Sequence, residues 1–263
     1  MSIQIPMNYV VFDIETTGLN PKYEKIIEIG AARVQNGEVA DTFSTFVNPG
    51  RSLPERITQL TGIYDTDVIN APYIEDVFDA FTAFVGDDIL LGHNLIFDYS
   101  FVKKAAVNQK KKFERKGIDT LRIARRFLSD LESRNLSFLC DYYQIHLEAH
   151  RALNDALATH ALYQRLVASF ADKEAELFLP RELVYNVKKE GPITPRQYEL
   201  LLKLAKQYRL ETYAGEADSI VLKPVAKVTA DSVDLKRLTK NEASRLIDKL
   251  LSTFGRSNLS SSN

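Results

Sequence analysis

Two acidic residues at the end of an apolar segment could do chemistry. Asp13 and Glu15 follow the run YVVF at residues 9–12 and precede two threonines and a glycine. Side chains two residues apart on a β-strand point to the same face, so these carboxylates should lie side by side. Neighbouring anions repel each other unless a positive charge compensates them. By itself, the pair is compatible with a strand that ends in solvent and with a metal site.

Two further acids and a histidine stand where predicted strands and helices meet. Asp98 lies in HNLIFDYSF, about one turn into a predicted helix, and Asp155 begins a later helix, five residues after His150. Asp155 shares a helical face with Leu162 and Leu166, so its side chain should point toward the sheet. A carboxylate that faces a core is unfavourable unless a cation or hydrogen-bond donors compensate it.

Any one of these acids could simply be hydrogen-bonded within the protein, but four of them at one rim of a sheet favour a metal site. Hard oxygen ligands favour Mg²⁺ or Mn²⁺ over zinc. Two such ions about 3.5–4 Å apart stabilise both the attacking and the leaving oxygen in phosphoryl transfer. An imidazole, which titrates near about 6.5 when unperturbed, can accept a proton at neutral pH. The imidazole of His150, close in sequence to Asp155, could accept a proton in such a site.

The composition is that of an ordinary globular protein. The 263 residues are 45% hydrophobic and 26% charged, and the net charge of -1 gives no global basic field. Cys140 is the only cysteine, which excludes an intrachain disulfide and a cysteine-rich zinc site. No run of about 18 apolar residues could span a bilayer, and the N-terminal residues lack the pattern of a signal peptide. We expect a cytoplasmic protein that does not contact a membrane.

The order of the predicted elements indicates an α/β domain. Three β-rich segments, joined in part by a tight hairpin at Asn36–Glu38, are followed by alternating helical and strand patterns up to about residue 171. This order predicts a mixed sheet with helices on its faces. We assign residues 1–171 to this domain.

The remainder of the chain has a different character. Residues 172–191 are charged and read as a linker, and residues 192–255 contain two amphipathic helical patterns. Thr194 with Pro195 predicts the start of the first helix, and a capping box from Thr239 to Glu242 predicts the start of the second. We expect a small, mainly helical module followed by a disordered tail at 256–263. The module could attach the chain to nucleic acid or to a polymerase, or could cap the first domain.

Three motifs resemble those of the DEDDh family of 3′-to-5′ exonucleases, which includes the proofreading epsilon subunit of bacterial DNA polymerase III. They are FDIETTG at 12–18, GHNLIFDYSF at 92–101 and HRALNDA at 150–156. The resemblance extends from about Tyr9 to Phe170. It implies a ribonuclease H-like fold, with a mixed five-stranded sheet flanked by helices, and two divalent metal ions, Mg²⁺ or Mn²⁺.

The resemblance also implies roles for the candidate residues. Asp13 would bridge both ions, Glu15 and Asp155 would hold the ion that activates water, and Asp98 would serve the other ion. His150 would take the proton from the attacking water.

Contacts with the terminal nucleotide should not read its identity, because an exonuclease removes every base. The resemblance implies that the backbone amides of Thr16 and Thr17 hold the 3′ hydroxyl and the sugar. Apolar side chains offer sequence-tolerant stacking. Leu60 and Ile63 are similar to family positions that pack on the last bases. His93, Asn94 and Phe97 are further candidates, with ordinary core packing as the alternative for Phe97.

Residues 103–126 form the densest basic region, with ten Lys and Arg residues against Glu114 and Asp119. Such a run is either a solvated face or a track for the phosphate backbone.

Together these features predict a metal-dependent 3′-to-5′ exonuclease that releases nucleoside monophosphates from single-stranded or frayed 3′ ends of DNA. RNA as a substrate, and a DNA polymerase as a partner in proofreading or repair, stay open. The alternative is a catalytically silent nucleic-acid-binding or polymerase-scaffold protein. Such a protein would be expected to have lost some of the acids, whereas all four and the histidine are present here.

Overall fold

The computed structural model describes residues 3–215, 218–225, 227–229 and 232–255. The chain divides into two compact units, one of Met1–Pro49 with Arg56–Lys188 and one of Gly50–Glu55 with Lys189–Asn263. The predicted disordered tail at 256–263 lies outside the described residues.

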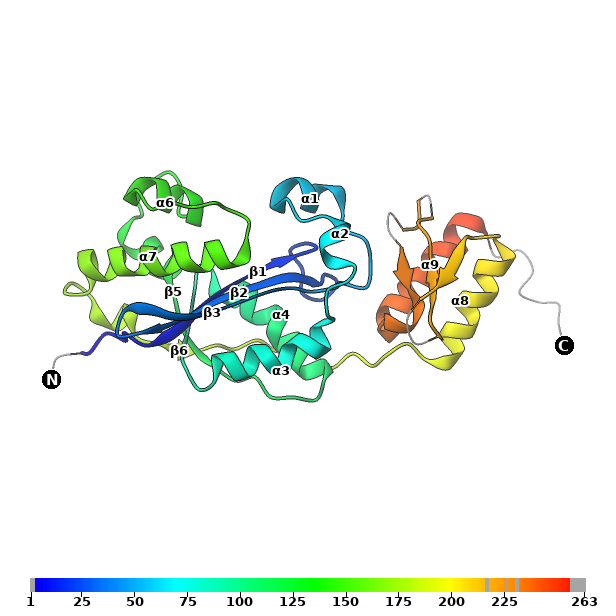
Figure 1. The fold of residues 1–263 in the computed structure, drawn as a ribbon, viewed down its shortest axis with the longest axis horizontal. Coiled ribbons are helices and arrows are strands. Elements are labelled where there is room, and N and C mark those ends of the chain that lie inside the picture. Colours follow the sequence, from blue (N-terminus) through cyan, green and yellow to red (C-terminus); the bar gives the residue numbers. More distant parts are fainter. Residues whose placement is uncertain (1–2, 216–217, 226, 230–231, 256–263) are drawn as a thin grey trace. The chain divides into compact units, whose positions relative to one another are not determined.

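A six-stranded mixed sheet forms the centre of the first unit, in the order β3-β2-β1-β4-β5-β6 (Figure 1). Its strands are β1 (Tyr9–Thr16), β2 (Ile26–Gln35), β3 (Glu38–Phe46), β4 (Leu90–Gly92), β5 (Lys116–Asp119) and β6 (Arg181–Glu182). β4 runs parallel to β1 and β5, and the other neighbouring strands are antiparallel. The predicted mixed sheet is confirmed. Positive φ angles of 53° at Asn36 and 82° at Gly37 also fit a tight hairpin between β2 and β3.

The expected count of five strands is wrong, because part of the segment predicted as a linker adds a sixth. Arg181 and Glu182 pair antiparallel with Gly117 and Lys116. Just before them, Phe178 is fully buried against Tyr163, at a ring-centroid distance of 6.2 Å. A two-residue strand is too short to produce an alternating pattern in the sequence. The buried ring of Phe178 contributes to holding the segment against the first unit.

Seven helices are described in the chain up to residue 170: α1 (Glu55–Thr61), α2 (Asp65–Val68), α3 (Ile74–Val85), α4 (Leu95–Asn108), α5 (Thr120–Phe127), α6 (Leu136–Tyr143) and α7 (Ala152–Phe170). α3 and α4 cover one face of the sheet, and α6 and α7 cover the other (Figure 1). The side chains of β1 divide between these faces. Val10, Phe12 and Ile14 pack with α3 and α4, whereas Tyr9 and Val11 pack with α7. Continuing the second row places Asp13 and Glu15 on the α7 side.

The second unit is built from α8 (Pro195–Gln207), α9 (Lys240–Phe254) and a small antiparallel sheet of β7 (Thr212–Ala214), β8 (Ile220–Leu222) and β9 (Val233–Asp234). Thr194 and Thr239 cap the two helices in capping boxes, in which their hydroxyl oxygens accept from the backbone N–H groups of Gln197 and Glu242. The unit has its own hydrophobic core, which includes Leu204, Leu222 and Leu250. The three strands were not predicted, so the expectation of a mainly helical module needs this correction.

No helix within the described ranges has the length and the apolar character needed to cross a membrane.

Candidate active site

β1 and β2 together place three carboxylates near the start of α7. Glu15 on β1 lies opposite Glu28 on β2, and Asp13 lies opposite Gly30. Gly30 permits a close approach, because a Cβ atom there would lie 2.0 Å from the backbone nitrogen of Leu153. The absence of a side chain at this position therefore lets the first turn of α7 rest directly on β2. This approach brings the acidic end of β1 and the start of α7 together.

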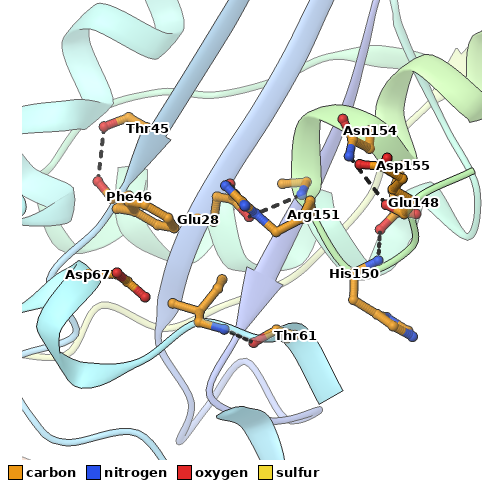
Figure 2. A network of polar contacts seen from close by, with 12 residues as sticks. Glu28, Thr45, Phe46, Thr61, Asp67, Glu148, His150, Arg151, Asn154 and Asp155 are labelled. Atoms are coloured by element: carbon orange, nitrogen blue, oxygen red, sulfur yellow. Dashed lines mark hydrogen bonds and ion pairs between the residues drawn. The ribbon is translucent and has the colours of Figure 1, made fainter. Parts of the chain in front are cut away.

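His150 and Asp155 complete one part of the site (Figure 2). The backbone N–H of His150 donates to Oδ2 of Asp155 at 2.9 Å, and His150 adopts a left-handed conformation with φ of 68°. One potential ligand atom from each of Glu15, His150 and Asp155 lies within 4.8 Å of the other two. Asp155 is buried and His150 is exposed. These three side chains form a candidate site for a divalent metal ion that remains open to solvent on the histidine side.

Asp98 reaches the same end of the sheet from the first turn of α4. It is buried, and its Oδ1 accepts a hydrogen bond from the backbone N–H of Ile14 at 3.1 Å. Ile14 lies between Asp13 and Glu15 in β1. This bond therefore fixes the side chain of Asp98 beside the two β1 carboxylates.

Burial and neighbouring carboxylates raise the pKa values of the four acids. Burial, followed by the charges of Asp98, Asp155, Glu15 and Glu28, raises the pKa of Asp13 well above its usual range. Burial and then the charges of Asp155 and Glu28 raise the pKa of Glu15 to about 8, although Arg151 opposes this shift. Burial also raises the pKa of Asp98, and it raises that of Asp155 to about 6. This concentration of negative charge, with oxygen donors in the majority, fits a divalent metal centre.

The shifted pKa values predict that raising the pH destabilises the metal-free protein at this site. A carboxyl group with a raised folded-state pKa stabilises the fold below its unfolded pKa, and this contribution is lost as the pH rises through the folded pKa. For Asp155 and Glu15 the loss should extend through about pH 6 and about pH 8. In EDTA, the melting temperature of Glu15→Gln should match the wild type near pH 5 and exceed it at pH 9. Parallel curves of melting temperature against pH for the two proteins would contradict this account. Added Mn²⁺ should raise the melting temperature of the wild type most at high pH.

The predicted substrate residues differ in their hydrogen bonding and in their exposure to solvent. The backbone N–H of Thr17 donates to the carbonyl of Lys25 at 2.9 Å, so binding of a sugar by this amide requires that bond to break. Thr16 is buried, and its hydroxyl donates to the carbonyl of Gly18. Both threonines thus stabilise the turn that follows β1.

The apolar candidates also differ in exposure. Leu60, in the last turn of α1, is 53% exposed, whereas Ile63 is buried just beyond the end of that helix. Phe97 is half-buried, and its ring lies 5.2 Å from that of Phe101. Leu60 is thus the candidate most accessible to a base.

Both ring nitrogens of His93 have partners within the protein. Nδ1 lies 2.9 Å from Oγ1 of Thr120, and Nε2 lies 2.8 Å from the carbonyl oxygen of Arg134. Burial lowers the pKa of His93, which favours a neutral ring that donates from Nε2. Asn94 is exposed in a left-handed conformation, and its backbone N–H donates to Asp119. The ring of His93 is therefore engaged within the protein, while the side chain of Asn94 is accessible.

Most of the basic stretch at 103–126 is occupied within the protein. Lys103 pairs with Glu114, Lys111 with Asp79 and Arg126 with Glu174. Four further side chains have partners of their own, namely Lys104, Arg115, Lys116 and Arg122. Lys110 and Lys112, and Arg125 farther along the stretch, are exposed. The stretch is thus mainly structural, and these two lysines are the accessible cations at its centre.

Glu28 and Arg151 belong to the site but were not selected from the sequence. Glu28 is 2% exposed, and its carboxylate accepts hydrogen bonds from the guanidinium of Arg151 and from the backbone N–H of Ala152 (Figure 2). The available signal was a single charged residue inside the otherwise apolar run IIEIGAARV. A charge at that position of a buried strand requires a partner.

A family model described as Exonuclease matches residues 10–163, which is more than half of the chain. The chain belongs to this exonuclease family. Among similar proteins, the PolC-type DNA polymerase III of Clostridium perfringens is 44% identical over 152 residues, covering 57% of this chain and 10% of that protein. The PolC-type polymerase of Bacillus subtilis is 40% identical over 168 residues, covering 63% of this chain and 12% of that protein. The exonuclease chain thus spans about a tenth of the length of these relatives.

Solved structures share the fold of this exonuclease. Exonuclease X in complex with 5′ overhanging duplex DNA aligns with a TM-score of 0.53 at 23% identity, covering 65% of this chain and 99% of that one. The nuclease domain of 3′hExo, described as a DEDDh family member bound to rAMP, aligns with a TM-score of 0.56 at 19% identity. The alignment covers 68% of this chain and 98% of that one. The predicted ribonuclease H-like class of fold is confirmed by these neighbours.

Proposed function

We propose that the chain is a divalent-metal-dependent 3′-to-5′ exonuclease that releases nucleoside monophosphates. The observation that carries this proposal is the convergence of Asp13, Glu15, Asp98 and Asp155 with His150 at one end of the sheet. The match to the exonuclease family supports it. The silent scaffold is not favoured, because every one of these five side chains is present.

The four carboxylates would hold two divalent ions, Mg²⁺ or Mn²⁺. Asp13, which interacts electrostatically with the other three acids, would contact both ions. Glu15 and Asp155 would hold one ion, and Asp98 the other. When bound, such ions stabilise the charge that develops on the phosphate and lower the pKa of a bound water.

His150 would remove the proton from the attacking water. Its ring lies beside Glu15 and Asp155, and it is exposed to the solvent from which that water comes. The position is that of a general base next to the metal ligands rather than of a buried structural histidine.

The substrate that we propose is a single-stranded or frayed 3′ end of DNA. The similarity to PolC-type DNA polymerases supports DNA and a proofreading or repair context. Exposed Leu60 offers an apolar surface for a terminal base. RNA is the competing substrate, since one structural neighbour is described as bound to rAMP.

A single assay compares these substrates. DNA and RNA strands of the same sequence carry a label on the 3′-terminal nucleotide, and a duplex DNA carries it on either a paired or a mismatched 3′ end. The proposal predicts release of the label as a nucleoside monophosphate in the first turnover, faster from DNA and fastest from the single strand and the mismatch. Faster release from RNA would assign RNA as the substrate in place of DNA. Release of the label only within longer fragments would exclude a 3′-to-5′ exonuclease.

We propose that the second unit binds nucleic acid alongside the catalytic unit. Its sequence holds 14 Lys and Arg against 10 Asp and Glu, a net charge of +4, whereas the first unit holds 20 against 25, a net charge of -5. Arg196, Lys203 and Lys206 are exposed along α8. A negatively charged catalytic unit repels a polyanion, so a basic unit on the same chain would raise the affinity for it.

Salt dependence tests this binding. Replacing Arg196, Lys203 and Lys206 with alanine should lower the slope of log affinity against log salt for single-stranded DNA, by about 0.7 for each phosphate that the variant no longer neutralises. Lys110→Ala with Lys112→Ala tests the first unit in the same way. Binding is measured in EDTA by fluorescence anisotropy. Lys223→Ala is the control, because Lys223 already pairs with Glu211 at 2.8 Å. An unchanged slope in either variant would show that the corresponding surface does not bind DNA.

A further inference from the structure

We propose that the Glu28–Arg151 ion pair is a positioning device for His150. The pair would fix the segment before α7 against β2 and thereby keep the imidazole beside Glu15 and Asp155. The inference rests on the proposed function of His150 as the general base. Neither Glu28 nor Arg151 would need to touch the reacting atoms.

The contacts of Glu28 provide the first argument. Its carboxylate accepts from Nη2 of Arg151 at 3.1 Å, from Nε of Arg151 at 3.3 Å and from the backbone N–H of Ala152 at 3.1 Å. All of these donors belong to the two residues that follow His150. An unpaired carboxylate at 2% exposure would be strongly unfavourable. The buried charge on β2 therefore holds this one segment of the chain in place.

The backbone of His150 provides the second argument. A left-handed φ of 68° is unfavourable for a residue other than glycine and persists where its surroundings impose it. Here one anchor lies on each side. The N–H of His150 is bound by Asp155 at 2.9 Å, and the next residue is bound by Glu28. Losing the second anchor would free the backbone on one side of the imidazole.

Arg151 is well suited to this role because it also contacts β3. Its guanidinium lies 5.4 Å from the ring centroid of Phe46, and about half of its side chain remains exposed. Figure 2 shows Arg151 between Glu28 and the first turn of α7, with His150 on the other side of that turn. The guanidinium thus joins β2, β3 and the start of α7 through one side chain. A rigid joint at this place would limit the movement of the neighbouring residue.

Two other roles must be separated from positioning. The pair could serve only to stabilise the fold, or the exposed half of Arg151 could bind a substrate phosphate directly. A purely structural pair predicts changes throughout the unit, and direct phosphate binding predicts a higher KM with an undisturbed His150.

The test observes His150 itself in the metal-free protein. The chain has four histidines, so its imidazole protons give few NMR signals, and His150→Gln identifies the signal of His150. In Arg151→Ala and in Glu28→Gln, this signal should move toward that of His146, whose side chain is 89% exposed. The signals of His93 and His160, which have partners within the fold, should stay in place.

Kinetics supply the second measurement. Arg151→Ala should lower kcat on single-stranded DNA about 10²-fold with little change in KM, since misplacing a catalytic group by about 1 Å costs this much. Arg151→Lys keeps the charge but cannot donate two parallel hydrogen bonds, so its kcat should lie between those of Arg151→Ala and the wild type. Added guanidinium at millimolar concentration should restore part of the activity of Arg151→Ala but not of Glu28→Gln.

Each result supports or overturns the proposal. A loss of kcat together with a shifted His150 signal and rescue by guanidinium supports positioning. A raised KM with an unshifted His150 signal would assign Arg151 to the substrate, and shifts of all four histidines would assign the pair to fold stability. An unshifted signal with full activity would show that the pair is dispensable. If the wild-type chain proved inactive, the proposed function would fail, and the NMR signals would still decide whether the pair orders His150.

Discussion

Asp13→Asn is expected to reduce metal-dependent hydrolysis by at least about 10³-fold. The substitution keeps the shape of the side chain and removes one charge from the centre of the acidic cluster, where Asp13 interacts with all the other acids. Metal ions contribute several kcal/mol to the transition state of such reactions, and each 1.36 kcal/mol corresponds to a factor of ten in rate. Rates on single-stranded DNA with Mg²⁺ or Mn²⁺ measure the loss.

The same variant should be more stable than the wild type in the absence of metal. Burial and the neighbouring carboxylates raise the pKa of Asp13, so its ionised form destabilises the folded state at neutral pH. Melting temperatures in EDTA measure this gain, and Asp172→Asn, on an exposed turn, is the matched control for both experiments. Full activity of Asp13→Asn would rule out the metal site as proposed, and loss of activity through unfolding would show as a lower melting temperature.

His150→Gln is expected to lower kcat by about 10² to 10⁴-fold, which is the usual contribution of a general base. The effect should be confined to the chemical step. His150 is exposed, so its side chain contributes little to packing. Its link to Asp155 runs through the backbone N–H, which glutamine retains. The melting temperature and the affinity for DNA in EDTA should therefore stay close to those of the wild type.

His146→Gln is the control for this substitution. His146 lies four residues away with a side chain that is 89% exposed, and its Nε2 lies 3.9 Å from the carboxylate of Glu148. Its replacement should leave kcat unchanged. Equal rates for His150→Gln and the wild type would remove the histidine from the mechanism, and Glu28 and Arg151 would then have no general base to position.

Local sequence patterns select the acidic residues of the candidate site because each of its parts is local. The alternation of β1 places Asp13 and Glu15 on one face, and the helical period of α7 turns Asp155 toward the sheet. The three motifs carry the family resemblance, and the match of the exonuclease family model over residues 10–163 confirms it. The close approach at Gly30 then converts these separate patterns into one site.

The part of the site that the sequence did not predict depends on long-range register. Glu28 lies near the site because β2 pairs with β1 so that Glu28 faces Glu15. It is paired because Arg151, 123 residues later, reaches it. Neither relation has a period or a spacing along the chain. The sequence does not predict the hydrogen bonds of His93 for the same reason, since its partner Arg134 lies 41 residues away in sequence.

Short elements set the other limit. β6 has two residues, and β7 and β8 have three each, which is fewer than the roughly four residues over which an alternation can be recognised. Ile63 and Leu60 show the same limit for helix ends. They lie three residues apart, yet the helix stops at Thr61, so one side chain is buried and the other is exposed.

The central claim is that this site removes nucleotides from a 3′ end with the help of a divalent cation. The most direct measurement follows 5′-labelled single-stranded DNA on a sequencing gel, with Mg²⁺, with Mn²⁺ and with EDTA, beside the Asp13→Asn variant. The account predicts a ladder that shortens one nucleotide at a time from the 3′ end, only with a metal and only in the wild type. A labelled mononucleotide as the first product, a ladder that persists in EDTA, or equal cleavage by the variant would contradict it.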